Sequence, residues 1–166
     1  MFDLKPLHRD ALPAALEKAE RYRLLNEPIE AESICLDVLQ VDPGNARAIV
    51  TLLLSLSDQF GRRLGEKYQQ ARELLERLDD GYQRTYYEGI LYERRAKISL
   101  GSHDPGSGHV AYEWFRRAMD CYEKAHAIRP AGNEDTTLRW NTCARILNRN
   151  PSVVAGHDDD TNQMLE

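Results

Sequence analysis

The sequence has no apolar run long enough to cross a bilayer. Its longest apolar stretch, residues 49–56, still contains Thr51 and Ser55, whereas a spanning helix needs about 20 apolar residues. The N-terminus, MFDLKPLHRD, has no basic start followed by an apolar segment. These absences predict a chain without membrane insertion or a secretory signal, located in the cytoplasm.

Cysteine is scarce and has no metal-binding or redox spacing. The three cysteines, Cys35, Cys121 and Cys143, are odd in number and far apart. Such a set is typical of reduced thiols in a core, and it argues against a disulfide framework or a zinc site. We expect half-buried thiols and no resident metal or other cofactor.

The chain lacks the excess of basic charge that generic nucleic-acid binding requires. It has 22 Lys and Arg residues against 27 Asp and Glu residues, and the last sixteen residues carry four of these acids and no base. The rest of the chain is nearly neutral, so we expect no nucleic-acid partner. Residues 151–166 are polar and acidic, which predicts a disordered tail behind a folded domain of residues 1–150.

Helical periodicity is abundant, and strand patterns are scarce. Small and apolar residues recur at helical spacing over residues 14–25 and again over residues 29–41. The tripeptide Asn-Glu-Pro at 26–28 lies between them and suits the start of a helix. The second segment stops before Pro43, because proline interrupts a helix. Residues 9–45 are therefore predicted to form a helix, a tight turn and a second helix.

The run AERYRLLNEPIEAESICLDVLQVDPGNARA resembles a tetratricopeptide repeat. It has small residues and an aromatic residue at the positions where helices of that family cross closely, and a proline closes the unit. The matching residues are Ala19, Tyr22, Ala31, Cys35, Val38 and Pro43. The resemblance implies an all-α fold in which helical pairs stack into a right-handed solenoid.

A second copy of this pattern lies downstream. The run FRRAMDCYEKAHAIRP repeats the closing half, and YQRTYYEGILYERR supplies the first helix. The matching residues are Gly89, Tyr92, Ala118, Tyr122, Ala125 and Pro130. Gly89 and Ala118 are 29 positions apart, whereas Ala19 and Ala31 of the first unit are twelve apart. This unit therefore carries an insertion of seventeen residues. The glycine in a helix predicts close packing against a neighbouring helix.

Two further segments extend the resemblance to residues 10–149. A weaker unit pairs a first helix at residues 46–60 with a second helix at residues 68–80, and it has about six extra residues. Residues 135–149 are predicted to form a last helix, which caps the exposed face of the third pair.

The insertion predicts an extended third hairpin and not a long loop. Helix-forming residues continue on both sides of residues 101–108, which alone carry turn chemistry. We expect an arm, residues 94–115, that projects beyond its neighbours and exposes part of Ile98 and Trp114. We hypothesise that this arm supports self-association into a homo-oligomer or contact with a partner. The alternative is that the extra turns pack on the extension of the second unit.

In tetratricopeptide proteins the first helix of each pair lines a concave groove, where ligands bind. The resemblance therefore implies a scaffold or adaptor for a protein or peptide, with apolar anchors and with arginines that orient acidic groups. The expected lining residues are Arg23, Arg47, Val50, Leu54, Tyr86, Ile90, Arg94, Asn141 and Arg145. The alternative is that Val50, Leu54 and Ile90 belong to the core and that the arginines are ordinary surface residues.

No catalytic pattern stands out, because the serine, histidine and aspartate residues lack the context of a nucleophile. We therefore expect no enzyme. One rival is a small secretion or assembly chaperone of tetratricopeptide type. A rival of another class is a metal-dependent protein centred on residues 101–109, with His103, Asp104 and His109 as ligands. A plain connecting loop explains this segment better, because glycines separate the histidines and no third ligand converges on them.

Overall fold

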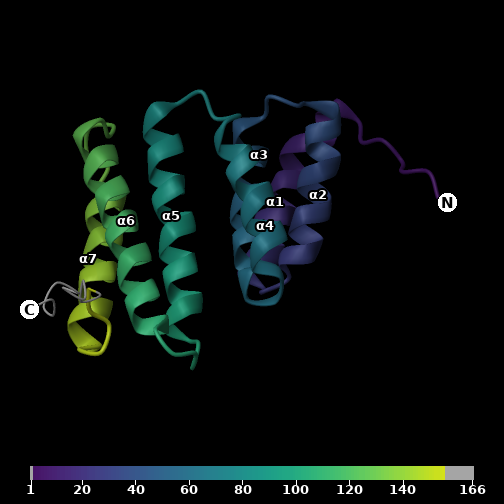
Figure 1. The fold of residues 1–166 in the computed structure, drawn as a ribbon. Coiled ribbons are helices and arrows are strands. Elements are labelled where there is room, and N and C mark those ends of the chain that lie inside the picture. The colour runs from purple at the N-terminus through teal and green to yellow at the C-terminus, as the bar shows by residue number, and fades with distance from the viewer. Residues whose placement is uncertain (1, 156–166) are drawn as a thin grey trace, which may run out of the picture.

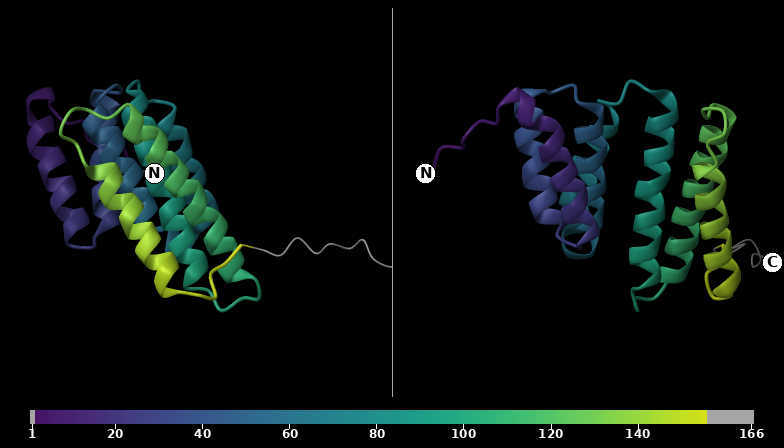
Figure 2. Two further views of the ribbon diagram at one scale, coloured as in Figure 1. Left: turned by 90° about the vertical axis from the view of Figure 1, so that its left-hand side faces the viewer. Right: turned by 180° about the vertical axis from the view of Figure 1, so that it is seen from behind.

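The computed structural model describes residues 2–155, and within this range the chain is all-α, as expected (Figure 1). No residue of the range lies in a strand, and a short 3-10 turn precedes the first helix. The α-helices are α1 Leu12–Leu24, α2 Pro28–Val41, α3 Ala46–Asp58, α4 Phe60–Leu75, α5 Gly81–Leu100, α6 Ser107–Ala127 and α7 Asp135–Arg149. Each helix packs on the one before it, and the two ends of the described chain lie on opposite sides of the molecule (Figure 2).

Capping residues between the periodic segments set several helix boundaries. Asn45 precedes α3, and its side chain accepts a hydrogen bond from the backbone N–H of Ala48 at 3.0 Å. Asp80 caps α5 in the same way, with the backbone N–H of Gln83 at 3.1 Å. Pro28 begins α2, at a position where the missing backbone donor is not needed. These contacts satisfy amide groups that the start of a helix leaves without a partner.

The second pair differs from the prediction at its turn. The periodicity predicted a first helix through residue 60, but α3 ends at Asp58 and Phe60 already belongs to α4. The extra residues lengthen α4 at its start, and that helix bends at Arg63 (φ −145°, ψ 59°). Phe60 is 2% exposed and packs in the core. Burial of this ring therefore fixes a turn at Gln59 alone, where the sequence pattern suggested a longer helix.

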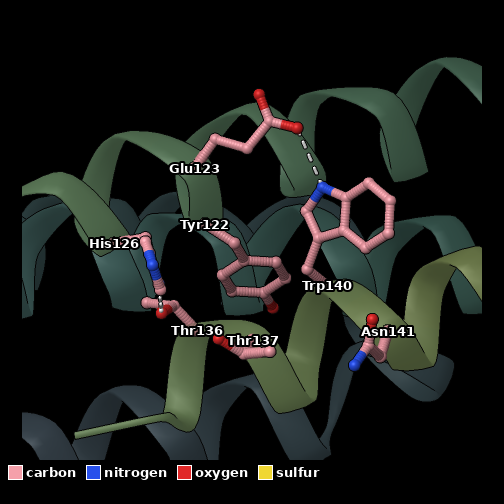
Figure 3. A pocket seen from close by; sticks show the side chains of 7 residues that line it. All are labelled: Tyr122, Glu123, His126, Thr136, Thr137, Trp140 and Asn141. Carbon is pink, nitrogen blue, oxygen red and sulfur yellow. Dashed lines mark hydrogen bonds between the residues drawn. The ribbon is translucent and has the colours of Figure 1, made fainter. Parts of the chain in front are cut away.

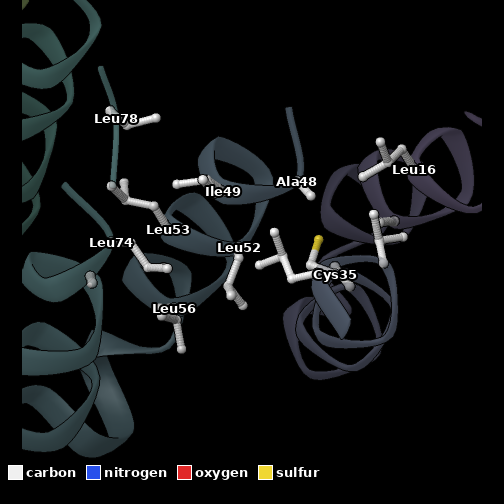
Figure 4. Packing of buried hydrophobic residues seen from close by; sticks show 14 of the residues in the cluster. Leu16, Cys35, Ala48, Ile49, Leu52, Leu53, Leu56, Leu74 and Leu78 are labelled. Atoms are coloured by element: carbon white, nitrogen blue, oxygen red, sulfur yellow. The ribbon is translucent and has the colours of Figure 1, made fainter. Parts of the chain in front are cut away.

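Two clusters of buried side chains hold the helices together. The first cluster lies among α1 to α4 and is mainly aliphatic, as Figure 4 shows around Leu52. The second cluster lies among α5, α6 and α7 and is centred on Phe115 and Tyr122. Leu54 and Tyr87 contact both clusters. Side chains from α3 and α5 therefore connect the two halves of the molecule.

The small residues expected at helix crossings are buried. Ala19, Ala31, Ala118, Ala125 and Tyr122 are fully buried, Tyr22 and Tyr92 are half-buried, and Pro43 and Pro130 lie exposed in turns. Gly89 makes the closest approach, because a Cβ at this position would lie 2.7 Å from Cε1 of Tyr122. The close packing expected at Gly89 is therefore present, and a larger residue would push α5 and α6 apart.

The third hairpin is longer than the other pairs, but much of its tryptophan is covered. α5 and α6 have 20 and 21 residues, whereas α1 to α4 have 13 to 16. The Trp114 ring is half-buried, with its centroid 5.5 Å from that of Tyr92 and 6.4 Å from that of Tyr68 in α4. The guanidinium carbon of Arg95 lies 4.0 Å from the Trp114 ring centroid. Trp114 is therefore partly exposed, as expected, but these rings and Arg95 cover much of it, and Ile98 is 37% exposed.

The packed part of the chain continues past the expected domain boundary at residue 150. Val153 is 5% exposed and belongs to the second core cluster. The backbone of Ser152 lies against Gly108, where a Cβ would be 2.9 Å from the Ser152 carbonyl oxygen. The first residues of the expected disordered tail therefore pack on the start of α6. Residues 156–166, which form the rest of the predicted disordered tail, lie outside the described residues.

Candidate functional site

Alternate helices of the chain share one surface, and ion pairs connect them across it. We call the side of the molecule on which ion pairs join α1, α3 and α5 the first-helix face. Its first link is a two-bond contact in which Arg47 of α3 donates to both carboxylate oxygens of Glu20 in α1, at 2.7 and 2.8 Å. This contact is the main cause of a lowered pKa of the Glu20 carboxyl group. Because Arg47 is exposed, its guanidinium group can leave Glu20 and bind an acidic group of a ligand in solution.

The second link joins three helices at one carboxylate. Asp58, at the end of α3, accepts a hydrogen bond from Nε of Arg23 in α1 at 2.8 Å. Its other oxygen accepts a hydrogen bond from Nη1 of Arg94 in α5. The side chains of Arg23, Asp58 and Arg94 are 20%, 21% and 25% exposed. Two guanidinium groups thus share a single carboxylate, which leaves the cluster with net positive charge.

A cavity of about 300 Å³ adjoins this charged cluster. Phe60 and Ile98 contribute apolar wall, and Lys97 adds a further basic side chain. A neighbouring cavity of about 410 Å³ shares Asn26, Asp58 and Gly61 with it and leads toward the turn between α1 and α2. The site therefore combines partly exposed cations with an apolar concavity, which suits a ligand with an acidic group beside an apolar one.

The third link is buried between α5, α6 and α7. Glu93 is 1% exposed and accepts hydrogen bonds from the Tyr122 hydroxyl at 2.6 Å and from Nη1 of Arg139 at 3.3 Å. Lys97 also donates to Glu93. A buried carboxylate needs such partners, because an unpaired charge in a core is costly. This network is thus part of the framework that positions α7 beside α5.

The pKa shifts around Glu93 follow from burial and from its charge. Burial, reinforced by the Glu93 carboxylate, raises the pKa of Tyr122 far above its ordinary value, so the hydroxyl keeps its proton and donates it. Burial is the largest influence on the pKa of Arg139 and lowers it, but Glu93, Tyr86 and Tyr122 together outweigh burial, so the pKa of Arg139 is raised. Arg139 is therefore a permanent cation in this network.

The apolar residues expected to line the groove lie deeper than predicted. Ile90 is 2% exposed and belongs to the second core cluster, so its assignment to the lining is wrong. Val50 and Leu54 are half-buried and pack against the cores. Tyr86 is half-buried and its ring is stacked on that of Tyr82, with centroids 5.8 Å apart. The alternative weighed from the sequence, that the aliphatic residues belong to the core, is correct for Ile90.

The last expected lining residues, both in α7, lie away from the ion pairs. Asn141 faces α6, and Arg145 is exposed. Arg139 is the α7 residue that pairs with α5, and the sequence reasoning missed it together with Asp58. One available signal for Asp58 is that it is the only acid in the segment 46–58. Arg139 has no comparable signal, because its partner Glu93 is 46 positions away.

A separate cavity of about 280 Å³ lies between α6 and α7, and Figure 3 shows the residues around it. Tyr122, Glu123 and His126 approach it from α6, and Thr136, Thr137, Trp140 and Asn141 approach it from α7. The indole Nε1–H of Trp140 donates to Glu123 at 2.9 Å. Nδ1 of His126 lies 3.0 Å from Oγ1 of Thr136. Sequence reasoning did not single out this cavity, whose floor is the buried Tyr122 ring.

Comparison with protein-family models, with curated proteins and with solved structures finds no match for this chain. The tetratricopeptide resemblance thus remains a prediction that rests on the quoted sequence positions.

The described residues contain no metal-ligand cluster. Among residues 2–155, no three histidine, cysteine, aspartate or glutamate side chains come together in a way that could hold a metal ion. In the 101–109 segment, Asp104 accepts a hydrogen bond from the Ser102 hydroxyl at 2.7 Å, which is a local turn contact. The metal-dependent alternative therefore receives no support from this segment. No helix of the described range is long and apolar enough to pass through a bilayer.

The three cysteines are more deeply buried than expected. Cys35, Cys121 and Cys143 are all buried and unpaired within the described range. Burial raises the pKa of each thiol to about 12. A thiol with such a pKa carries almost no thiolate at neutral pH, so none of the three is suited to act as a nucleophile.

Proposed function

We propose that this chain is a non-catalytic protein-binding scaffold of tetratricopeptide type, which takes up an acidic segment of a partner on its first-helix face. The observation that carries the proposal is the sharing of Asp58 by Arg23 and Arg94 beside the 300 Å³ cavity. Here one acid holds two cations that come from different helices, and an apolar concavity lies next to them.

The chemistry of recognition follows from this arrangement. A carboxylate of the partner competes with Asp58 for one face of each guanidinium group, which can bind a carboxylate through two parallel hydrogen bonds. A neighbouring apolar side chain enters the cavity against the exposed Ile98. The partner therefore needs an Asp or Glu residue close to an apolar residue, in a segment extended enough to reach both.

The experiment is a binding screen of the purified full chain against an array of acidic and apolar octapeptides. We expect bound peptides to pair Asp or Glu with a neighbouring apolar residue. Arg23→Gln combined with Arg94→Gln should lower their affinity at least tenfold. Arg21→Gln combined with Arg145→Gln removes the same charge from exposed positions and should leave the affinity within about twofold.

Two results would contradict this proposal. Equal losses in the two double variants would mean that net charge alone attracts the peptides. Unchanged binding in the Arg23 and Arg94 variant, with normal circular dichroism, would mean that the two arginines only hold α1, α3 and α5 together.

A further inference from the structure

Within the molecule, the crevice between one helical pair and the next is partly covered by the following helix. α4 covers the inner part of the crevice between α2 and α3, where its Phe60 is buried in the first core cluster, and a cavity of about 520 Å³ remains between α2 and α4. Lys67 of α4 also donates to both carboxylate oxygens of Glu32 in α2, at 2.8 and 3.1 Å. The covering helix thus contributes a large apolar side chain and a basic side chain.

The next crevice, between α4 and α5, is partly covered by α6. The Trp114 ring of α6 lies against Tyr68 of α4 and Tyr92 of α5. Arg117 of α6 stacks on this ring from the same helix, with its guanidinium carbon 4.6 Å from the centroid, and Arg95 of α5 lies on the ring at 4.0 Å. At both crevices, the covering helix therefore carries a large aromatic residue and a basic residue.

The crevice between α6 and α7 is the cavity of about 280 Å³, and no helix of residues 2–155 follows to close it. Tyr122 and Trp140 give it apolar walls. Glu123 lies at its rim, exposed, with one oxygen bonded to Trp140. Leu138 of α7, 63% exposed, is one turn from the lining residue Asn141. The cavity therefore offers space for one large apolar side chain and a carboxylate for one base.

We propose that this cavity docks an amphipathic helix of a partner protein, which continues the helical stacking of the chain. The inference rests on the repeat arrangement of the proposed function, but it concerns a different surface from the Asp58 cluster. The docked helix places a large apolar residue in this cavity, against the half-buried Trp140. A Lys or Arg residue about one turn away pairs with Glu123, as Lys67 pairs with Glu32.

Charge favours a partner protein over two other occupants. The C-terminal segment of this chain carries Asp158, Asp159 and Asp160, which would meet Glu123 with like charge. A second copy docked through α7 would bring the exposed Arg145 and Arg149 against their own equivalents. A helix with a basic edge toward α6 avoids both conflicts.

The test uses the full chain as the target for selecting helical peptides from a displayed library of amphipathic sequences. The selected peptides, called winners below, are then synthesised, and their affinity for the chain is measured by fluorescence anisotropy. We expect winners to share a large apolar residue with a Lys or Arg three or four positions away. Thr137→Arg, which fills the cavity, and Asn141→Lys should each weaken binding at least tenfold. The matched control is Thr142→Arg, because Thr142 lies roughly 140° around the same helix from Thr137. This control and Arg23→Gln with Arg94→Gln should keep wild-type affinity.

Several outcomes would overturn the inference. Wild-type affinity of the winners for both cavity variants, with normal circular dichroism, would place them elsewhere. Loss of affinity only with the Arg23 and Arg94 variant would place them at the Asp58 cluster, which would support the proposed function and not this inference. A dimer in sedimentation that Thr137→Arg dissociates would identify a second copy as the occupant. A chain ending at residue 155 that binds the winners at least tenfold more tightly would identify the C-terminal segment.

Discussion

The two core clusters of this molecule are built from different kinds of side chain. The cluster among α1 to α4 consists almost entirely of aliphatic and small residues. The cluster among α5 to α7 contains several aromatic rings, the closely packed Gly89 and the buried Glu93 with its partners. Aliphatic packing depends mainly on volume and tolerates rearrangement, whereas hydrogen bonds and close glycine contacts require one geometry. The second half should therefore be the more sensitive to small changes.

The largest effect is expected at Glu93. Glu93→Ala leaves the buried Tyr122 hydroxyl without its acceptor and takes the carboxylate away from the partly exposed Arg139 and Lys97, which should cost about 2–3 kcal/mol of unfolding free energy. Urea unfolding followed by circular dichroism measures this loss. Glu93→Gln, which keeps the shape and one acceptor oxygen, should lose less. A cost below about 1 kcal/mol for Glu93→Ala would show that the polar network adds little and that the two halves are alike.

A matched pair of glycine substitutions compares the halves directly. A Cβ at Gly89 in α5 would lie 2.7 Å from Tyr122, whereas a Cβ at Gly65 in α4 would meet nothing within 4 Å. Gly89→Ala should destabilise the protein by about 1–2 kcal/mol, because overpacking exceeds the gain in helix propensity. Gly65→Ala should be neutral or should stabilise by up to about 1 kcal/mol. Thermal unfolding of both variants measures these changes in stability. Equal changes would show that Gly89 is not packed more closely than Gly65.

Two truncations sharpen the boundary of the second half. A chain that ends at residue 151 loses Val153, whose burial contributes about 1.5–3 kcal/mol, so its melting temperature should fall by roughly 3–10 °C. A chain that ends at residue 155 keeps Val153 and should melt within about 2 °C of the full chain. Differential scanning calorimetry of the three chains measures this. A melting temperature that is the same for both truncated chains would mean that Val153 contributes no packing energy.

The smallest effect is expected at the surface of the first half, where Glu20 pairs with Arg47. The pKa of Glu20 is lowered from its ordinary value of 4.5, mainly by hydrogen bonding to Arg47. A lowered folded-state pKa contributes stability above the unfolded pKa, and this contribution disappears as the pH falls through the folded pKa. Arg47→Gln should therefore lower the melting temperature slightly at pH 7 and lower it by less at pH 3. A difference of the same size at both pH values would show that Arg47 acts through packing and not through charge.

The positions of the helices were largely predictable from the sequence. The proline at residue 28, the caps at Asn45 and Asp80, and the turn residues at 101–108 each act through neighbours within a few positions. Gly89 was also informative, because a glycine inside a helix costs free energy unless close packing offsets it. The turn at Gln59 was missed, since burial of Phe60 depends on helices that are distant in sequence.

The sequence by itself determined an all-α chain, the approximate helix boundaries and the small residues at helix crossings, because periodicity, capping and proline act locally. Only the tertiary structure decided that Arg23 and Arg94 share Asp58, which lies 35 and 36 positions from them. It also decided that Ile90 is core, that Trp114 is partly covered by Tyr68 and Tyr92, and that a cavity separates α6 from α7. Contacts of this kind depend on how helices far apart in sequence are placed, and no local pattern encodes that placement.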